Sequence, residues 1–526
     1  MESRRMYWGI PALLVALGVA APLQAQLLPA GEIHARVDAA LPRAFELYRE
    51  ILTYPNDAHH PADILRLLGW LDARFQERGF STERISTAGS PLLLAERRSS
   101  GAERTVLIYL QADGQPVDPS RWNQESPWVP VLKEPVAGGS WREIPWRRLE
   151  LAVTAGAAER ERLNPEWRIF ARSASDSKGP IAQFLTAITL LDEAGITPDF
   201  HMKVIVDTQE EMGSPHLPAA VQRHREKLAA DMLVIFDGPP HVSGRPTLKF
   251  GARGIATASI TTYGPLAPQH SGHYGNYLPN PVFHLSRILA SAKDADGRVT
   301  IPGWYDGVQL DAGTRRILAE VPDDEEAILR SMGVASRDLV GDNLQEAVQY
   351  PSLNVRGIRA GWVGSEARTI VPDEAVAELD IRLVAESDAE RLIGLLRRHV
   401  EEQGFHVLSR APTPEERRTI PRIATLTYNR AYGAFRTPFD SEPGRWLTGA
   451  FVHLHGDEPI RIRTSGGSIP IAPFVETLGV PAVSVPTVNP DNNQHSPNEN
   501  LRVGSFVEGI RIVMAVLQQP VRKSGP

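Results

Sequence analysis

The sequence predicts an α/β protein in which a mainly parallel sheet domain carries an inserted α+β domain. Nearly continuous apolar runs alternate with helical patterns up to residue 252, which is typical of strands buried on both faces of a parallel sheet. From residue 253 the strands alternate apolar and polar residues, which favours a small antiparallel sheet with helices on one face. The length of 526 residues supports two domains, because one ordinary core seldom holds so many residues.

The first domain is predicted to span residues 33–252 and 412–520. It contains a helix over residues 62–78, whose apolar face holds Ile64, Leu68, Leu71 and Phe75. Strand and helix patterns then alternate in the order "PLLLAERR", "TVLIYLQAD", "GPIAQFLTAITLLDEAG", "MKVIVDTQEE" and "DMLVIFDGP". The strands end in acidic side chains, namely Asp113, Glu210, Glu211 and Asp237. Because ligands gather at the carboxyl ends of strands in such sheets, these acids mark a candidate site.

The inserted domain is predicted over residues 253–411. It opens with the alternating strand "GIATASITTYG", followed by a helix that has Asn280 as its N-cap and Pro281 as its first residue. The strand "EAVAELDIRLV" and the helix "DAERLIGLLRRHVEEQG" follow after a polar stretch. This order of elements suits a small antiparallel sheet covered by helices.

Composition narrows the classes of function. A net charge of -7 and a pI near 6.1 give no basic field, which argues against nucleic acid as a partner. The chain has no cysteine, so disulfides, thiolate zinc sites and cysteine nucleophiles are excluded. Any metal ion must therefore bind His, Asp, Glu or amide oxygen.

The N-terminus, residues 1–25, is predicted to be a signal peptide. Arg4 and Arg5 precede an apolar run, and small residues follow it at Ala20, Ala21 and Ala25. Cleavage would give a periplasmic or secreted protein. The alternative is a retained membrane anchor, although the run is only marginally long enough to span a bilayer.

Several motifs hold side chains suited to metal or acid–base chemistry, but each also has an ordinary structural explanation. Asp176 in "SASDSKGP" precedes a helix and could be its cap. Glu210 and Glu211 in "QEEMGS" could be solvated acids, while Asp237 and His495 could be turn or loop residues. Their order along the chain is more informative than any one of them.

In order, the chain reads "LQADGQPVD", "SASDSKGP", "QEEMGS", "LVIFDGP", "GPLAPQHSGHYG", "SGGSIP" and "HSPNE". This series resembles the co-catalytic di-zinc metallopeptidase family of aminoacylases, carnosine dipeptidases and glutamate carboxypeptidases, and is most similar to the carnosine-dipeptidase branch. The resemblance runs over most of the chain after the signal and includes the inserted domain. It implies an α/β catalytic domain and an inserted lid domain through which two chains form a homodimer.

The resemblance implies a zinc site with distinct roles for its residues. Asp176 would bridge two ions, Glu211 and His495 would complete one metal site, and Asp237 would belong to the other. Glu210 would be the general base. The residue types suit this chemistry, because bound cations lower the pKa of water and a carboxylate can take the proton released during attack.

Four further residues match family positions. Asp113 corresponds to the catalytic aspartate that follows the first metal ligand. His270, in "QHSGHYG", corresponds to a lid histidine that is donated across the dimer to the neighbouring subunit's substrate, where it would stabilise an oxyanion. Arg382 in "DIRLV" and Ser468 in "GGSIP" correspond to residues that hold the carboxylate end of the substrate.

Gln111 departs from the family pattern, which has a metal-binding histidine at this position. A glutamine can bind metal through its side-chain oxygen, and its NH2 group could donate to Asp113. The site of Gln111, Asp176 and Asp237 would then have only oxygen ligands, which suit manganese or magnesium better than zinc. We therefore expect one or two Zn²⁺ per chain, with the Gln111 site weak or occupied by Mn²⁺. The alternative is that Gln111 marks an inactive site.

The sequence as a whole predicts an exported metallopeptidase that cleaves a peptide or amide bond in a small substrate with a free carboxylate. A dipeptidase or carboxypeptidase is favoured over an N-acyl amino acid deacylase. The alternative from another class is a catalytically impaired peptide-binding protein, for which Gln111 is the main argument.

Overall fold

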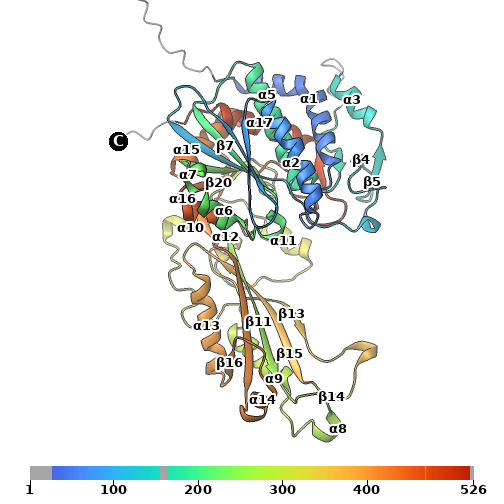
Figure 1. Cartoon of the computed structure of the whole chain (residues 1–526), viewed down its shortest axis with the longest axis vertical. Coiled ribbons are helices and arrows are strands. Elements are labelled where there is room, and N and C mark those ends of the chain that lie inside the picture. The colour runs from blue at the N-terminus through green and yellow to red at the C-terminus, as the bar shows by residue number, and fades with distance from the viewer. Residues whose placement is uncertain (1–26, 155–162, 468, 522–526) are drawn as a thin grey trace, which may run out of the picture.

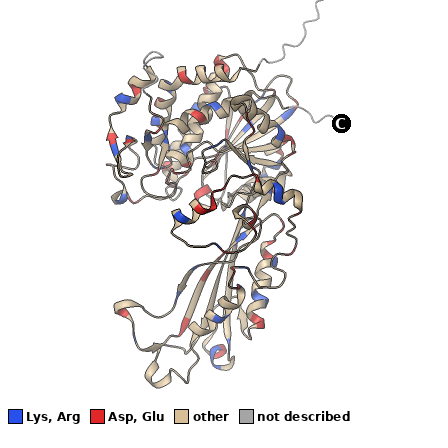
Figure 2. Cartoon of the chain, turned by 180° about the vertical axis from the view of Figure 1, so that it is seen from behind, with Lys and Arg blue, Asp and Glu red and all other residues tan. Residues whose placement is uncertain are grey.

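The computed structural model describes residues 27–154, 163–467 and 469–521, which form a large lobe and an elongated second lobe (Figure 1). The predicted signal peptide, residues 1–25, lies outside the described residues. Within the described part of the chain, none of the helices combines the length and apolar character needed to cross a membrane. Basic and acidic segments are interspersed over both lobes (Figure 2).

The large lobe is built on a mixed eight-stranded sheet. Its central strands β7, β3, β8 and β20 are parallel, and antiparallel pairs flank them. The strands in spatial order are β1 (Ser81–Ile85), β2 (Leu92–Arg97), β7 (Phe200–Asp207), β3 (Arg104–Gln111), β8 (Met232–Ile235), β20 (Ala482–Ser484), β9 (Thr247–Lys249) and β19 (Ile460–Ile462).

Both faces of this sheet are buried, as the continuous apolar runs predict. Along β3, Val106, Ile108 and Leu110 belong to one apolar core, whereas Leu107 and Tyr109 belong to another. The first core packs beneath α1 (Ala30–Leu52), α2 (Pro61–Gln76), α5 (Gly179–Glu193), α15 (Glu442–His455) and α17 (Val503–Gln518). The second packs beneath α6 (Leu217–Arg223), α7 (Arg225–Leu228) and α16 (Ala472–Leu478).

A small side sheet lies next to the large one. Its strands in order are β21 (Asn500–Arg502), β6 (Arg168–Phe170), β4 (Val131–Pro135) and β5 (Trp141–Ile144), with α3 (Trp146–Thr154) following β5. Short helical turns η1 (Pro119–Arg121), η2 (Ala174–Lys178) and η3 (Glu210–Met212) connect the elements around the candidate site. The Trp-rich stretch after residue 120 thus forms ordered strands that pair with the segment after His495 through β6 and β21.

The second lobe is a five-stranded sheet with an apolar core on one face. The strands in order are β13 (Asn354–Arg359), β15 (Glu374–Leu383), β11 (Gly254–Tyr263), β17 (Ile423–Tyr432) and β16 (His406–Leu408). The helices α9 (Pro281–Ala292) and α13 (Ala389–Glu402) pack on this core. Asn280 caps α9 by accepting from the Val282 N–H, as the sequence predicts.

The remaining elements lie at the ends of this lobe. The pair β12 (Gln269–His270) and β14 (Ile370–Val371) with α8 (Ser271–Tyr274) forms its far tip (Figure 1). The other short elements are α10 (Ala312–Ala319), α11 (Glu325–Met332), α12 (Leu344–Ala347), η4 (Gly364–Glu366) and α14 (Pro414–Thr419). The two strands β10 (Gly251–Ala252) and β18 (Phe435–Arg436) pair where the chain enters and leaves the lobe.

The end of the inserted sheet differs from the predicted boundary at residue 411. Strand β17 pairs with β11 along most of its length, so the sheet continues to Tyr432. The polar segment with α14 between β16 and β17 has the composition of a linker, but it is a connection within the sheet.

Candidate active site

The parallel strands bring the predicted residues to one edge of the large sheet. Strands β3 and β7 end together, with Gln111 opposite Asp207. Strand β8 ends at Ile235, two residues before Asp237. Glu210 then follows β7 in the short turn η3. Motifs that are far apart along the chain therefore lie together at the carboxyl ends of these strands.

Asp176 is held in place by Glu499, a buried residue that the sequence analysis did not assign. Glu499 Oε1 accepts the backbone N–H groups of Ser175 and Asp176, each at 3.0 Å, and its Oε2 accepts the N–H of Ser173 at 2.9 Å. Arg172 Nη1 pairs with Oε2 at 2.8 Å. Burial raises the pKa of Glu499, and the positive charge of Arg172 opposes this rise. The signal for this residue was present in the motif "HSPNE".

Asp176, Glu211 and His495 form a group whose ligand atoms all lie within 4.8 Å of one another. His495 Nε2 lies 3.0 Å from Asp176 Oδ2 and 3.2 Å from Glu211 Oε2. Gln115 Nε2 donates to Glu211 Oε2 at 2.9 Å and so orients this carboxylate. Two carboxylates and an imidazole that converge in this way fit a divalent ion such as zinc.

The close approach of these acids to one another and to His495 shifts their pKa values. Burial raises the pKa of Glu211 to about 8, with a further rise from the charge of Asp176 and a reduction from His495. The hydrogen bond to Asp176 raises the pKa of His495 to about 9, and burial opposes this rise. A cation at this position would replace the proton that these groups otherwise share.

Glu210 is positioned by Asp113. The two oxygens of Asp113 accept the backbone N–H groups of Glu210 and Glu211, each at 3.0 Å. Burial raises the pKa of Glu210 well above its usual value, and the charges of Asp176 and Glu211 raise it further. A carboxylate with a raised pKa is suited to take up a proton near neutral pH.

The prediction that Gln111 donates a hydrogen bond to Asp113 is wrong. The NH2 group of Gln111 instead donates to Asp176 Oδ1 at 2.9 Å and to Asp237 Oδ1 at 3.2 Å. The carboxylate of Asp113 faces the turn after β7, so its oxygens are already used by the backbone of Glu210 and Glu211. Asp113 is therefore a positioning residue in this structure.

Of the other predicted residues, two belong to the second lobe and one is not described. His270 is at the far tip of the second lobe, beside α8 (Figure 1). Arg382 stands opposite Ile255 on the inserted sheet, near the start of the insertion. Ser468 lies outside the described residues.

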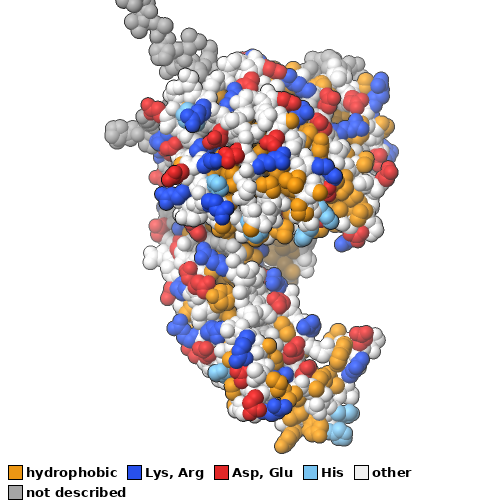
Figure 3. Space-filling model, in the orientation of Figure 1, with side chains coloured by type: hydrophobic (Ala, Val, Ile, Leu, Met, Phe, Trp, Pro, Cys, Tyr) orange, Lys and Arg blue, Asp and Glu red, His pale blue; other side chains and the backbone are white. Residues whose placement is uncertain are grey.

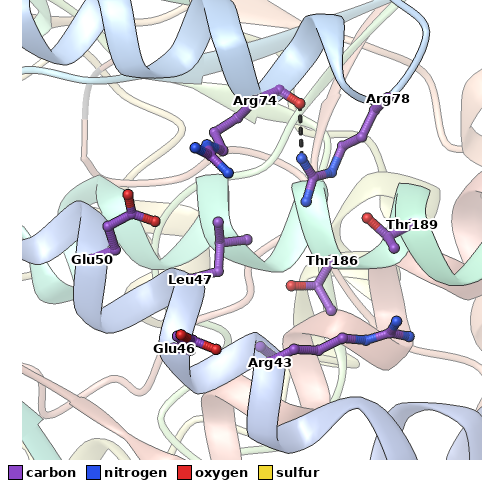
Figure 4. Close-up of a pocket in the computed structure, with 9 residues that line it drawn as sticks. Arg43, Glu46, Leu47, Glu50, Arg74, Arg78, Thr186 and Thr189 are labelled. Atoms are coloured by element: carbon purple, nitrogen blue, oxygen red, sulfur yellow. Dashed lines mark hydrogen bonds between the residues drawn. The ribbon is translucent and has the colours of Figure 1, made fainter.

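A separate pocket lies between α1, α2 and α5 and contains none of the predicted site residues (Figure 4). Arg78 Nη1 donates to the Arg74 carbonyl at 2.8 Å there, and Arg43 pairs with Glu193. Acidic and basic side chains both line the pocket, including Glu46 and Glu50. It therefore offers no uniform charge to a ligand.

Comparisons with known proteins support the family resemblance of the chain. A family model described as the peptidase dimerisation domain matches residues 250–407. The Cys-Gly metallodipeptidase dug1 of Schizosaccharomyces pombe is 26% identical over 442 residues, which cover 80% of this chain and 81% of that protein. The human Beta-Ala-His dipeptidase is 25% identical over 436 residues, which cover 81% of this chain and 76% of that protein.

A solved structure gives the same assignment. The M20 family metallo-carboxypeptidase Sso-CP2 from Sulfolobus solfataricus superposes with a TM-score of 0.71 and 26% identity, over 90% of this chain and 98% of that one. Fold and site thus define a metallopeptidase. The chain is similar over most of its length to M20 metallopeptidases, and Cys-Gly and Beta-Ala-His dipeptidases are among its homologues. The family resemblance and the α/β fold with an inserted domain are confirmed.

Proposed function

We propose that the chain is a metal-dependent dipeptidase or carboxypeptidase that acts on short peptides with a free carboxylate. The observation that carries this proposal is the convergence of Asp176, Glu211 and His495, with the Glu210 carboxylate beside them. The dipeptidase names of the homologues favour a peptide over an N-acyl amino acid as the substrate.

A metal ion at this site would lower the pKa of a water molecule and polarise the scissile carbonyl. Asp176, Glu211 and His495 would hold that ion. Glu210 takes the proton from the attacking water and returns it to the departing amine, a role that suits its raised pKa. Asp113 fixes the backbone from which Glu210 and Glu211 project, so that both carboxylates keep their places.

The substrate's carboxylate end would be held by Arg382 and Ser468, since a guanidinium matches carboxylate geometry. Arg382 stands near the start of the insertion, opposite Ile255. A substrate bound between the metal group and Arg382 would lie between the two lobes.

The proposed functional unit is a homodimer formed through the second lobe. His270 is exposed at the tip of that lobe, and its imidazole would act on a substrate bound to a second copy of the chain. Exposed apolar side chains accompany it, among them Tyr274 at 42% and Tyr277 at 84%, and Figure 3 shows hydrophobic and histidine side chains gathered at this tip. The edge strand β13 is also exposed, with Ile358 at 62%. Unpaired edges of this kind are ready to pair with another chain.

Export is part of the proposal. The basic and apolar pattern of residues 1–25 supports a cleaved signal, and thus a periplasmic or secreted enzyme. Processing is measured by sequencing the N-terminus of the protein recovered from its native compartment. An intact Met1 there would contradict cleavage.

The alternative of a peptide-binding protein rests on one observation, the Gln111 amide that occupies the carboxylates of Asp176 and Asp237. The two functions separate in a turnover assay. Chelated protein is given a panel of dipeptides and N-acyl amino acids, with zinc or manganese added back separately. Metal-restored hydrolysis that is abolished in Glu210→Gln supports the enzyme, and Glu226→Gln on α7 serves as the control. Peptide binding without turnover in the metal-loaded protein would support the alternative.

A further inference from the structure

Asp176 uses its two oxygens for different partners. Its Oδ2 faces His495 at 3.0 Å and Gln494 Nε2 at 3.3 Å. Its Oδ1 accepts from Gln111 Nε2 at 2.9 Å and from Ser177 Oγ at 3.0 Å. One oxygen is thus directed to the metal-binding group, and the other is bound by protein donors.

Asp237 is satisfied by the same donors. Its Oδ1 accepts from Ser177 Oγ at 3.0 Å and from Gln111 Nε2 at 3.2 Å. The amide nitrogen and the hydroxyl therefore both lie between the carboxylates of Asp176 and Asp237. A second cation bound by these two carboxylates would have to displace both donors.

The orientation of the Gln111 amide decides whether a second ion fits. With the amide reversed, its oxygen would face two carboxylate oxygens, which is repulsive unless a cation lies between them. In the structure the nitrogen faces them, and Gln111 Oε1 is buried without a hydrogen-bond partner. The residues at this position thus do not fit a second ion in their present arrangement.

Lys249 supplies the positive charge at this position. It is the last residue of β9, and its Nζ lies 3.8 Å from the point where a Cβ on Gly238 would stand, next to Asp237. Burial lowers the pKa of Lys249, and the negative charge of Asp237 opposes this shift. Among the hydrogen bonds of the described residues, none involves the Lys249 ammonium, which leaves its charge available to Asp237.

We propose that the chain binds a single metal ion, at Asp176, Glu211 and His495, and that Gln111, Ser177 and Lys249 replace a second ion beside Asp237. This inference rests on the proposed metal-dependent function. The protein donors satisfy the two carboxylates, and the lysine offsets part of their charge. The remaining ion keeps Glu211 and His495 as its own ligands and shares Asp176 with the protein network.

Zinc stoichiometry tests this proposal without an activity assay. The full chain is stripped with chelator, titrated with Zn²⁺ alone, dialysed, and analysed by native and inductively coupled plasma mass spectrometry. We expect one zinc ion per chain, lost in His495→Asn. Two tightly held ions would overturn this inference and leave the proposed function standing. No bound zinc in a folded chain would overturn the proposed function itself.

A gain of binding tests the residues that replace the ion. The double variant Gln111→His/Lys249→Met restores an imidazole and removes the ammonium, so we expect two zinc ions per chain. Lys203→Met, which removes a partly buried lysine elsewhere on the sheet, should keep one. Retention of the first zinc and an unchanged far-UV circular dichroism spectrum show that the double variant is folded. A folded double variant that still binds only one ion would overturn the role of Gln111 and Lys249.

Discussion

Glu499 holds Asp176 by its backbone, since Glu499 Oε1 accepts the Asp176 N–H at 3.0 Å. The same carboxylate pairs with Arg172 and is almost completely buried. The position of Asp176, the proposed metal ligand, therefore depends on the carboxylate of Glu499. This relationship has a direct consequence for stability.

Glu499→Gln should destabilise the large lobe by about 3 kcal/mol, because it leaves Arg172 buried without its counter-charge and gives the loop one fewer acceptor. Urea unfolding measures the loss. Glu508→Gln, which changes a more exposed acid paired with Arg511, should cost less than about 1 kcal/mol. Equal effects of the two substitutions would contradict the role of Glu499.

Asp113→Asn should weaken zinc binding by about 10- to 100-fold, the usual effect of changing a residue that orients a metal ligand. An asparagine has one acceptor oxygen for two N–H groups, so the turn that carries Glu210 and Glu211 loosens. Calorimetric titration with Zn²⁺ gives the affinity. Asp118→Asn, at the exposed N-cap of η1, is the control and should bind zinc as the unmodified chain does. An unchanged affinity in Asp113→Asn would show that Asp113 does not position the ligands.

Metal removal should lower the melting temperature of the large lobe. Without an ion, the crowded acids Asp176, Glu210 and Glu211 repel one another, and the stabilisation from binding is lost. At a free zinc concentration of 100 Kd that stabilisation is about 2.7 kcal/mol. Differential scanning calorimetry with and without chelator measures the shift, and His495→Asn should show almost none. A chelator effect of the same size in His495→Asn would place the ion elsewhere.

Ile358→Lys should convert a dimer to monomers, because it places a charge on the exposed edge strand β13. Light scattering coupled to size exclusion gives the mass. Val452→Lys, on α15 of the large lobe, should leave the mass unchanged. If His270 serves the neighbouring subunit, the monomeric variant also loses turnover while it retains zinc. A monomeric protein with full activity would contradict that role.

The second lobe has a local pH dependence at α14. The hydrogen bond from Arg410 lowers the pKa of Glu416 to about 2, and Glu416 also closes a capping box with Thr413. Because the folded pKa lies below the unfolded value of 4.5, this stabilisation is complete above about pH 4.5 and is lost as the pH falls through about 2. Amide-exchange protection factors of α14 should therefore be equal at pH 7 and pH 5 and fall near pH 2. In Glu416→Gln the protection should no longer change between pH 5 and pH 2.

The sequence was sufficient for the sheet and for the edge at which acids gather, because apolar periodicity and strand-end residues are local signals. The contacts between segments distant in the sequence could not be predicted, because they depend on the folded structure. The Gln111 amide turns to Asp176 and Asp237 because the backbone after β7 already occupies Asp113. Lys249 comes from an unremarkable short strand, and only the folded sheet places it beside Asp237.

The paired crossings β10 and β18 have a mechanical consequence. Both links between the lobes pass side by side, so they act as one hinge rather than two separate tethers. The hinge leaves no room for added atoms: a Cβ on Gly251 would stand 2.6 Å from the Phe435 carbonyl oxygen, and one on Gly254 would stand 2.5 Å from the Gly433 carbonyl carbon. A methyl group at Gly251 or Gly254 would separate the paired strands and change the angle between the lobes. If a peptide binds between the lobes as proposed, the distance between its two ends depends on two glycines that contact neither end.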